Sequence, residues 1–310
     1  MAAELITSAQ NPKIKRLLAL QKDSSLRRET GLFVVEGRRE LQHCIDAGFE
    51  IDSMFVCPEI AGAADIGREV PSSFATAEDS ACARVHFEAP LREKKAEYSL
   101  NGAPECTVAQ TSGTVVSTAA KVFEVSEAVY EKIAYRGGTE GVMAEVKVKS
   151  RKLEDLQLPE NPLIVVLEAV EKPGNLGAVL RSADAAGADA VIICDPLTDL
   201  YNPNLIRASI GAIFTVPCIA CSSEEAISFL KEHGISILTA QLQDSSLYYD
   251  TDMRRGTAIV MGTESTGLSQ QWRAAASAHI RIPMLGQLDS LNVSVSAAIL
   301  LFEAVRQRQG

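Results

Sequence analysis

Three short polar clusters hold the residue types that could bind a ligand or act on one. They lie at Pro173–Gly177, Gly262–Gly267 and Ser290–Ser294. Each occurs where an apolar run gives way to a helical pattern, as in a loop that leaves a buried strand and enters a helix. Ligands of open α/β sheets bind at such strand ends. The sequence therefore predicts a single site built from all three clusters.

The first cluster combines flexible backbone with one versatile side chain. Gly174 and Gly177 permit a tight turn and a close backbone approach. The Asn175 carboxamide can both donate and accept hydrogen bonds. Arg181 follows six residues later in the predicted helix, and arginine suits phosphate or carboxylate recognition. The alternative interpretation is a capping asparagine and a surface arginine.

The second cluster resembles no standard nucleotide loop. Glu264 occupies the middle glycine position of a G-x-G-x-x-G pattern, and a carboxylate there would repel a pyrophosphate. No P-loop pattern occurs in the chain. A nucleoside triphosphatase or a nicotinamide dehydrogenase is therefore poorly supported.

The third cluster precedes the last helical pattern. Ser290 and Asn292 would be ordinary helix caps, or they would place hydroxyl and amide groups beside a cleft. Pro283 and Gly286 indicate an irregular loop just before them. Both interpretations remain open on the sequence alone.

The elements that must position these clusters alternate along the chain. Apolar runs at 163–170 and 190–195 are typical of strands covered on both faces, and further strands are predicted at 235–240, 258–262 and 279–283. Helices are predicted at 175–186, at 202–214 and from Ser222 to Gly234. Leu291, Val295, Ala298, Phe302 and Val305 form the apolar stripe of an amphipathic terminal helix. Such alternation predicts an α/β fold with a largely parallel sheet.

The first half of the chain has a different organisation. Asn11 and Pro12 predict a helix start, and strands are predicted at 31–36 and 51–57. A half-buried strand is expected at 142–148, after helices at 38–47 and 127–134. The stretch 61–120 has no clear period and is interpreted as an irregular insertion. The predicted domains are 1–150 and 162–310, joined by a linker at 151–161.

Bulk properties bound the environment of the protein. The chain has 310 residues, a net charge of −10 and seven cysteines. No apolar run reaches the roughly 18 residues of a membrane span, and no signal peptide is evident. The odd cysteine count fits a reducing cytoplasm. Cys218 and Cys221 form one Cys-x-x-Cys without a second ligand pair, so no metal site is predicted.

Charge is unevenly distributed along this acidic chain. Eight basic and three acidic residues lie between Asn11 and Arg39, a local net charge of +5. Such a stripe favours a polyanion as partner, although a solvated helix face would read the same way. The candidate RNA contacts are Lys13, Lys15, Arg16, Arg27, Arg28 and Arg38.

Taken together, the three clusters resemble the SpoU (TrmH) family of RNA ribose 2′-O-methyltransferases, in the SPOUT superfamily. The matching text is EAVEKPGNLGAVLRSADAAG at 168–187, IVMGTESTGL at 259–268 and IPMLGQLDSLNVSVSAAILLFEAVRQR at 282–308. The segment that begins ITSAQNPKIKRLLAL is similar to the small substrate-binding domain of the same family.

The resemblance implies a trefoil-knotted catalytic domain, a homodimer and S-adenosylmethionine as cofactor. The positions that correspond to cofactor contacts are Gly262, Ile282, Leu291, Thr239, Ala240, Met284 and Ser290. The catalytic positions that correspond are Arg181, Asn175, Glu264, Ser290 and Asn292. The family assigns the base to the arginine; a clamp on the adjacent phosphate suits its high pKa equally well.

The resulting expectation is methyl transfer from S-adenosylmethionine to a ribose 2′-hydroxyl of RNA. Ribosomal RNA is favoured because a separate amino-terminal RNA-binding domain precedes the catalytic one. Transfer RNA is an alternative substrate. A non-catalytic RNA-binding or ribosome-assembly protein and a Rossmann-type oxidoreductase are the alternative functions.

Overall fold

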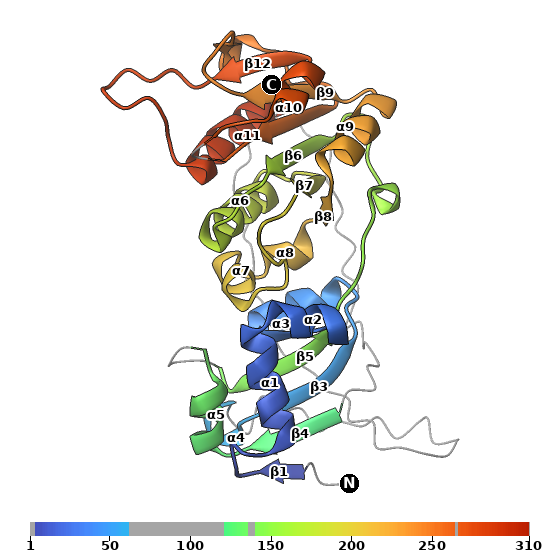
Figure 1. Ribbon diagram of the computed structural model, residues 1–310, viewed down its shortest axis with the longest axis vertical. Helices are drawn as coiled ribbons and strands as arrows, with labels where there is room; N and C mark the ends of the chain where they lie inside the picture. The colour runs from blue at the N-terminus through green and yellow to red at the C-terminus, as the bar shows by residue number, and fades with distance from the viewer. Residues whose placement is uncertain (1–3, 62–120, 136–139, 264–265, 310) are drawn as a thin grey trace.

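The described part of the chain forms two sheets, one from each half of the sequence (Figure 1). The computed structural model describes residues 4–61, 121–135, 140–263 and 266–309. The expected insertion at 61–120 therefore lies, apart from Ala61, outside the described residues. Within the described part of the chain, no helix combines the length and apolarity needed to cross a bilayer.

The amino-terminal sheet is mixed and has the strand order β1-β4-β3-β5-β2. β4 runs parallel to both β1 and β3, whereas β5 runs antiparallel to both β3 and β2. Its strands are β1 Glu4–Ile6, β2 Leu32–Glu36, β3 Ile51–Val56, β4 Lys121–Val125 and β5 Val142–Lys147. Its helices are α1 Pro12–Lys22, α2 Ser24–Thr30, α3 Arg38–Asp46, α4 Pro58–Ala61 and α5 Glu127–Ile133.

Helix α1 begins as its sequence predicts. The Asn11 side chain accepts a hydrogen bond from the Lys13 amide at 2.9 Å, and Pro12 takes the first helical position. Such a cap satisfies an amide that has no partner inside the helix. Ile14, Leu17 and Leu20 then face the sheet as a fully buried stripe.

Strand β5 differs from its prediction as a half-buried strand. Every residue from Val142 to Val146 is buried, because α1 covers the face that was expected to meet water. Glu145 is fully buried there, and its carboxylate pairs with Arg16 and accepts a hydrogen bond from the Ser53 hydroxyl at 2.7 Å. The polar residue in the alternating pattern is thus a buried carboxylate that pairs with a partly exposed arginine of α1.

The carboxyl-terminal sheet has seven strands, all parallel, in the order β10-β12-β9-β11-β6-β7-β8. This confirms the predicted parallel α/β architecture. The strands are β6 Leu163–Glu168, β7 Ala190–Cys194, β8 Cys218–Cys221, β9 Ser236–Ala240, β10 Ser246–Leu247, β11 Thr257–Met261 and β12 Ala278–Arg281. Strands β6, β7 and β11 are buried along their whole length, as expected for a sheet covered on both faces.

Helices connect these strands: α6 Pro173–Ala185, α7 Pro203–Ala208, α8 Ala212–Thr215, α9 Ser223–Glu232, α10 Gln270–Ala275 and α11 Val293–Gln309. The single helix predicted at 202–214 is wrong, because the backbone reverses between α7 and α8. Ile210 and Gly211 there have φ values of +55° and +80°. A Cβ on Gly211 would also lie 2.9 Å from the His43 ring, so this turn lets α8 approach α3.

Helix α11 is present as predicted, but its buried face is a different one. Val293, Ala297, Leu300, Leu301 and Ala304 are the residues that it buries against the domain. The predicted stripe lies outside this face, with Val295 47% and Phe302 49% exposed. Helix α11 therefore carries a second apolar surface that the described part of the chain leaves exposed.

Arg308, near the end of α11, joins that helix to the segments that precede the central strands β6 and β11. Its guanidinium donates hydrogen bonds to the carbonyls of Asn161, Pro162, Met253 and Arg255 at 2.7 to 3.1 Å. Burial lowers the pKa of this arginine. The contacts tie α11 to the segments that lead into β6 and β11.

The two halves of the chain pack against each other through a common apolar core. The Phe33 ring of β2 stacks on Tyr201, with the ring centroids 4.3 Å apart. Beside them, Arg27 Nε donates to Asp199 Oδ2 at 2.6 Å, and Arg27 is only 4% exposed. A buried ion pair and stacked rings therefore fix the amino-terminal domain onto the loop before α7. The domain bounds 1–150 and 162–310 stay a prediction.

Candidate functional site

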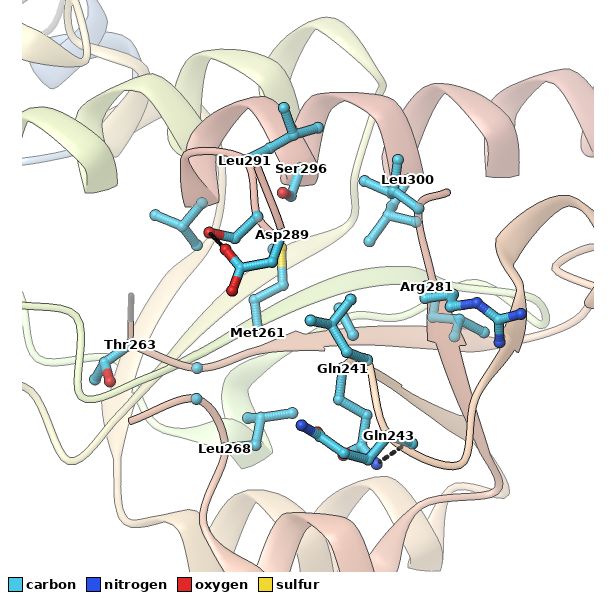
Figure 2. Close-up of a pocket in the computed structure, with 18 of the residues that line it drawn as sticks. Gln241, Gln243, Met261, Thr263, Leu268, Arg281, Asp289, Leu291, Ser296 and Leu300 are labelled. Atoms are coloured by element: carbon cyan, nitrogen blue, oxygen red, sulfur yellow. Dashed lines mark hydrogen bonds between the residues drawn. The ribbon is translucent and has the colours of Figure 1, made fainter. Parts of the chain in front are cut away.

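The main cavity lies at the carboxyl ends of β9, β11 and β12, where the sequence places two of its three clusters. Its volume is about 520 Å³. It is bordered by the segments 240–243, 261–263 and 266–268, by parts of the loop between β12 and α11, and by the first turns of α11. Figure 2 shows Thr263 and Arg281 at opposite ends of it. This position follows the strand-end rule for parallel sheets.

Most of the predicted cofactor positions line this cavity. The ones that do are Ala240, Gly262, Ile282, Met284, Ser290 and Leu291. Thr239 does not: it is fully buried in β9, and its hydroxyl lies 2.6 Å from His279 Nδ1 in the adjacent strand. Thr239 therefore supports the cavity wall from behind.

The loop after β11 closes tightly on itself. The Gly267 amide donates to the Thr263 carbonyl at 3.1 Å, and the Thr266 amide donates to the Thr263 hydroxyl at 3.0 Å. A Cβ on Gly262 would lie 2.2 Å from the Gly267 carbonyl oxygen. Since no side chain fits in that space, glycine at 262 is a geometric requirement of this wall.

A second, smaller cavity of about 200 Å³ opens beside the first, between the loops that follow β6 and β11. Both cavities share Gly262, Thr263 and Val293 as lining residues. The segment 169–172 and Asn175 complete the smaller one. The chain leads from β6 to β7 on one side and from β11 to β12 on the other. Because the strand order reverses between β6 and β11, this is a switch point of the sheet.

One hydrogen bond joins the first cluster to the third. Asn292 Nδ2 donates to Asn175 Oδ1 at 3.1 Å. Asn292 Oδ1 in turn accepts from the Ser294 amide at 2.9 Å and from its hydroxyl at 2.6 Å, at the start of α11. Asn292 therefore caps α11 and also lines the main cavity, while its catalytic role stays a prediction.

The other three predicted catalytic residues have separate outcomes. Ser290 lines the main cavity, and its hydroxyl donates to Asp289 at 3.4 Å. Arg181 lies on an exposed part of α6 and lines neither cavity. Glu264 lies outside the described residues.

Several lining residues escaped the sequence reasoning. Gln241, Leu242 and Gln243 follow β9 directly, and Arg281 ends β12. Their position at strand ends was the signal that could have identified them. Arg273 reaches the cavity from α10 and donates to the Leu268 carbonyl at 3.2 Å, a contact that no pattern announces.

The basic stripe divides into paired and exposed residues. Arg27 is buried against Asp199, and Arg38 donates to the Ala61 carbonyl. Arg16 pairs with Asp52 and Glu145, and Lys13 pairs with Glu4 at 2.9 Å. Lys15 and Arg28 are exposed. The stretch thus contributes fewer available charges than its composition suggests.

The Cys-x-x-Cys pair lies in β8, on the far side of the sheet from the main cavity. Burial raises the pKa of the Cys218 thiol to about 12, which disfavours the thiolate that zinc requires. Among the described residues, no group of three or more histidine, cysteine or acidic side chains could hold a metal ion.

Strand-end cavities at a switch point, without a phosphate loop, define an α/β ligand-binding protein of the parallel-sheet class. Comparison with known families is more specific. Residues 162–302 match the SpoU rRNA Methylase family, and residues 11–88 match an MRM3-like substrate binding domain.

Alignments with full-length proteins support the same family. The chain is 34% identical over 231 residues to the 23S rRNA (guanosine-2′-O-)-methyltransferase RlmB of Bordetella pertussis, across 73% of this chain and 89% of that protein. It is 33% identical over 174 residues to the 23S rRNA (uridine(2479)-2′-O)-methyltransferase of Streptomyces viridochromogenes, across 54% of this chain and 60% of that one. The chain therefore belongs to the SpoU family, within the SPOUT superfamily, and the predicted resemblance is confirmed.

Solved structures agree over nearly the whole chain. A crystal structure described as an RNA 2′-O ribose methyltransferase has a TM-score of 0.70 and 35% identity, covering 98% of this chain and 99% of that one. An AdoMet-bound rRNA methyltransferase from Sinorhizobium meliloti has a TM-score of 0.75 and 26% identity, covering 98% of both chains. Family membership argues against the Rossmann-type oxidoreductase alternative.

Proposed function

We propose that this protein transfers a methyl group from S-adenosylmethionine to a ribose 2′-hydroxyl of ribosomal RNA. The observation that carries the proposal is the pair of adjoining cavities that share Gly262, Thr263 and Val293. S-adenosylmethionine in one cavity and the RNA ribose in the other would lie close together at these shared residues. Holding them together removes much of the entropic barrier to their reaction.

The residues of the main cavity fit S-adenosylmethionine. Its volume of about 520 Å³ lies in the range of small-molecule sites. Its walls combine apolar residues, among them Leu268, Leu291 and Leu300, with glycines and uncharged polar residues of three strand-end loops. This lining suits an adenosyl group better than a triphosphate. When bound there, the cofactor would supply an activated methyl group.

The smaller cavity would receive the target ribose. Asn175 lines it and is held by Asn292 at 3.1 Å, so its carboxamide would orient the ribose beside the shared wall. We assign Arg181 to the RNA phosphate next to that ribose, since its exposed position on α6 suits a backbone contact and guanidinium matches phosphate geometry. A positive charge there would also ease loss of the 2′-hydroxyl proton. Glu264 is assigned to fixing the loop after β11.

The proposal includes a homodimer through the carboxyl-terminal domain and a trefoil knot in its backbone. The exposed stripe of α11 supports the dimer, with Val295 and Phe302 about half exposed. The segment between β12 and α11 also projects from the domain (Figure 1), and Leu285 on it is 97% exposed. Apolar surface of this kind marks an interaction site. The knot rests on the family resemblance.

The substrate is tested by methyl transfer from labelled S-adenosylmethionine to three RNAs. These are ribosomal and transfer RNA transcribed without modifications, and the deoxyribose analogue of the ribosomal target. We expect label in the ribosomal RNA alone, at a 2′-oxygen. Preference for transfer RNA would show that ribosomal RNA is not the main substrate. Equal transfer to the deoxyribose analogue would exclude methylation of a 2′-oxygen.

A non-catalytic role makes the opposite prediction in the same assay. Tight binding of RNA without transfer to any of the three would favour an RNA-binding or ribosome-assembly protein. Work on ribosomal RNA would take place in the cytoplasm, the compartment that the cysteine content predicts.

A further inference from the structure

A buried carboxylate lies directly behind the site and has no place in the mechanism above. Glu168 is the last residue of β6 and is only 6% exposed. It lines neither cavity. Burying a carboxylate is costly unless hydrogen bonds hold it. A buried carboxylate at the end of a strand beside the site therefore needs a structural explanation.

That reason is a contact with the exit of the loop that follows β11. Glu168 Oε2 accepts a hydrogen bond from the Ser269 amide at 2.8 Å. Ser269 is the residue that precedes α10, directly after Leu268 in the cavity wall. The first described part of the same loop is closed by Thr263, Thr266 and Gly267. The loop is thus closed at its base and held at its exit by one carboxylate from another strand.

We infer that Glu168 is a positioning residue for cofactor binding. Its charged acceptor holds the Ser269 amide, and this contact fixes Leu268 and Gly267 against the main cavity. Hydrogen bonds to charged groups are stronger than neutral ones, and an amide left unpaired on burial is destabilising. The inference deepens the proposed function, because it concerns the wall of the same cofactor site.

The chain supplies four informative variants. Glu168→Ala removes the acceptor, and Glu168→Gln restores an acceptor oxygen without the charge. Ser269→Pro removes the donor, and the φ of −66° at Ser269 is one that proline adopts. Ser269→Ala is its matched control, because the Ser269 hydroxyl is buried and no described residue hydrogen-bonds to it.

Asp189 provides a second control of the same chemistry. Its Oδ2 accepts from the Leu163 amide at 2.7 Å, at the opposite end of β6 from Glu168. Asp189→Ala therefore removes an equivalent carboxylate-to-amide bond far from the cavity.

The test measures S-adenosylmethionine affinity by calorimetry on the full chain, together with kcat and KM for the cofactor. We expect Glu168→Ala and Ser269→Pro to weaken binding by roughly 10-fold or more, the equivalent of one charged hydrogen bond. The main kinetic effect should be on KM for the cofactor. Glu168→Gln should recover most of the affinity, and Ser269→Ala and Asp189→Ala should retain it.

Tryptophan fluorescence gives a readout that needs no cofactor. Trp272 is the only tryptophan of the chain, lies fully buried in α10 and donates to the Ser223 hydroxyl at 2.9 Å. Its emission should shift in Glu168→Ala and Ser269→Pro while the melting transition remains cooperative. A variant that fails to fold would lose that transition. If this happens to Glu168→Ala or Ser269→Pro, the other of these two variants tests the inference.

Two results would overturn the inference. Unchanged affinity and emission in Glu168→Ala would show that the contact positions nothing. Equal losses in Glu168→Ala and Glu168→Gln would assign the effect to charge and not to the held amide. Absence of cofactor binding by the wild-type chain is a different result, since it would refute the proposed function itself.

Discussion

At the scale of single residues, the site is built by hydrogen bonds between motifs that are far apart in sequence. Asn175 and Asn292 are 117 positions apart and bond directly, at 3.1 Å. Glu168 reaches Ser269 across 101 positions. The reactive groups therefore depend on backbone geometry that only the complete sheet provides.

Arg181→Ala tests the proposed phosphate contact. Methyl transfer should fall by at least about 100-fold, on the scale of losing one charge-stabilising group in a transition state. Cofactor affinity should stay within about twofold, because Arg181 does not line the main cavity. Single-turnover transfer and calorimetry measure the two effects.

The matched control for Arg181 is Arg254→Ala, an exposed arginine of the same domain whose side chain is 68% exposed. It should transfer methyl groups at the wild-type rate. Full activity of Arg181→Ala would remove this residue from the mechanism.

Gly262→Ala tests the closed loop after β11. A Cβ at this position would lie 2.2 Å from the Gly267 carbonyl oxygen, whereas a Cβ on Gly174 would meet nothing within 4 Å. We expect Gly262→Ala to lose at least about 10-fold in cofactor affinity, since overpacking displaces the wall. Gly174→Ala should bind normally, and equal affinities for the two variants would contradict this account.

At the scale of secondary-structure elements, α11 serves two surfaces. One face packs on α6 and β11 through Val293, Ala297, Leu300 and Leu301. The other carries Val295 and Phe302 into solvent. A helix with apolar residues on two sides is expected where a second partner covers one of them.

Phe302→Glu should therefore convert a dimer into a monomer. A charge placed in the centre of an apolar interface is left unpaired on burial, which costs several kcal/mol (roughly 3–5). Light scattering coupled to size exclusion measures the mass. Leu197→Glu is the control, since Leu197 is 62% exposed outside α11, and a wild-type chain that is already monomeric would refute the interface.

The same helix shows what sequence patterns could and could not determine. Its existence and a cap at Ser290 or Asn292 were predicted, because 3.6-residue periodicity and capping are local properties. Which of two apolar stripes faces the domain depends on contacts with α6, and no local pattern encodes that choice. The break between α7 and α8 escaped for a related reason, because Ile210 takes a left-handed φ of +55° that its residue type does not favour.

The candidate site follows the same division. Gly262, Ser290, Leu291 and Asn292 were located by motif and strand-end position, and the structure brings them to one cavity. Thr239 was predicted to contact the cofactor, but it lies behind the cavity wall, where its hydroxyl contacts His279. Arg273 was missed because it reaches the cavity from a helix face.

At the scale of the whole molecule, an ion pair and stacked rings join the two domains. Arg27→Ala should lower the free energy of unfolding by about 3 kcal/mol, the lower end for a broken buried pair because Asp199 keeps partial solvent access. Arg28→Ala, on the exposed side of the same helix, should change it by no more than about 0.5 kcal/mol. Denaturant melts of both variants give the comparison, and similar losses would contradict a burial-dependent role.

RNA binding should depend on the exposed members of the basic stripe. The double variant Lys15→Glu with Arg28→Glu should bind RNA more weakly and reduce the salt slope of log K by about 0.7–0.9 for each lost phosphate contact. Lys152→Glu with Lys231→Glu makes the same charge change at exposed sites elsewhere and should leave the slope unaltered. Equal slopes for the two double variants would place the RNA contacts outside this stripe.

The four backbone contacts of Arg308 bear on the order in which the two domains can fold during translation. They join residues 161 and 162 to a side chain that emerges from the ribosome almost 150 codons later. Since domains fold as their last necessary segments appear, the amino-terminal domain can assemble early, while the carboxyl-terminal sheet waits for α11. Until then its strand ends stay open, and neither reactant has a place to bind.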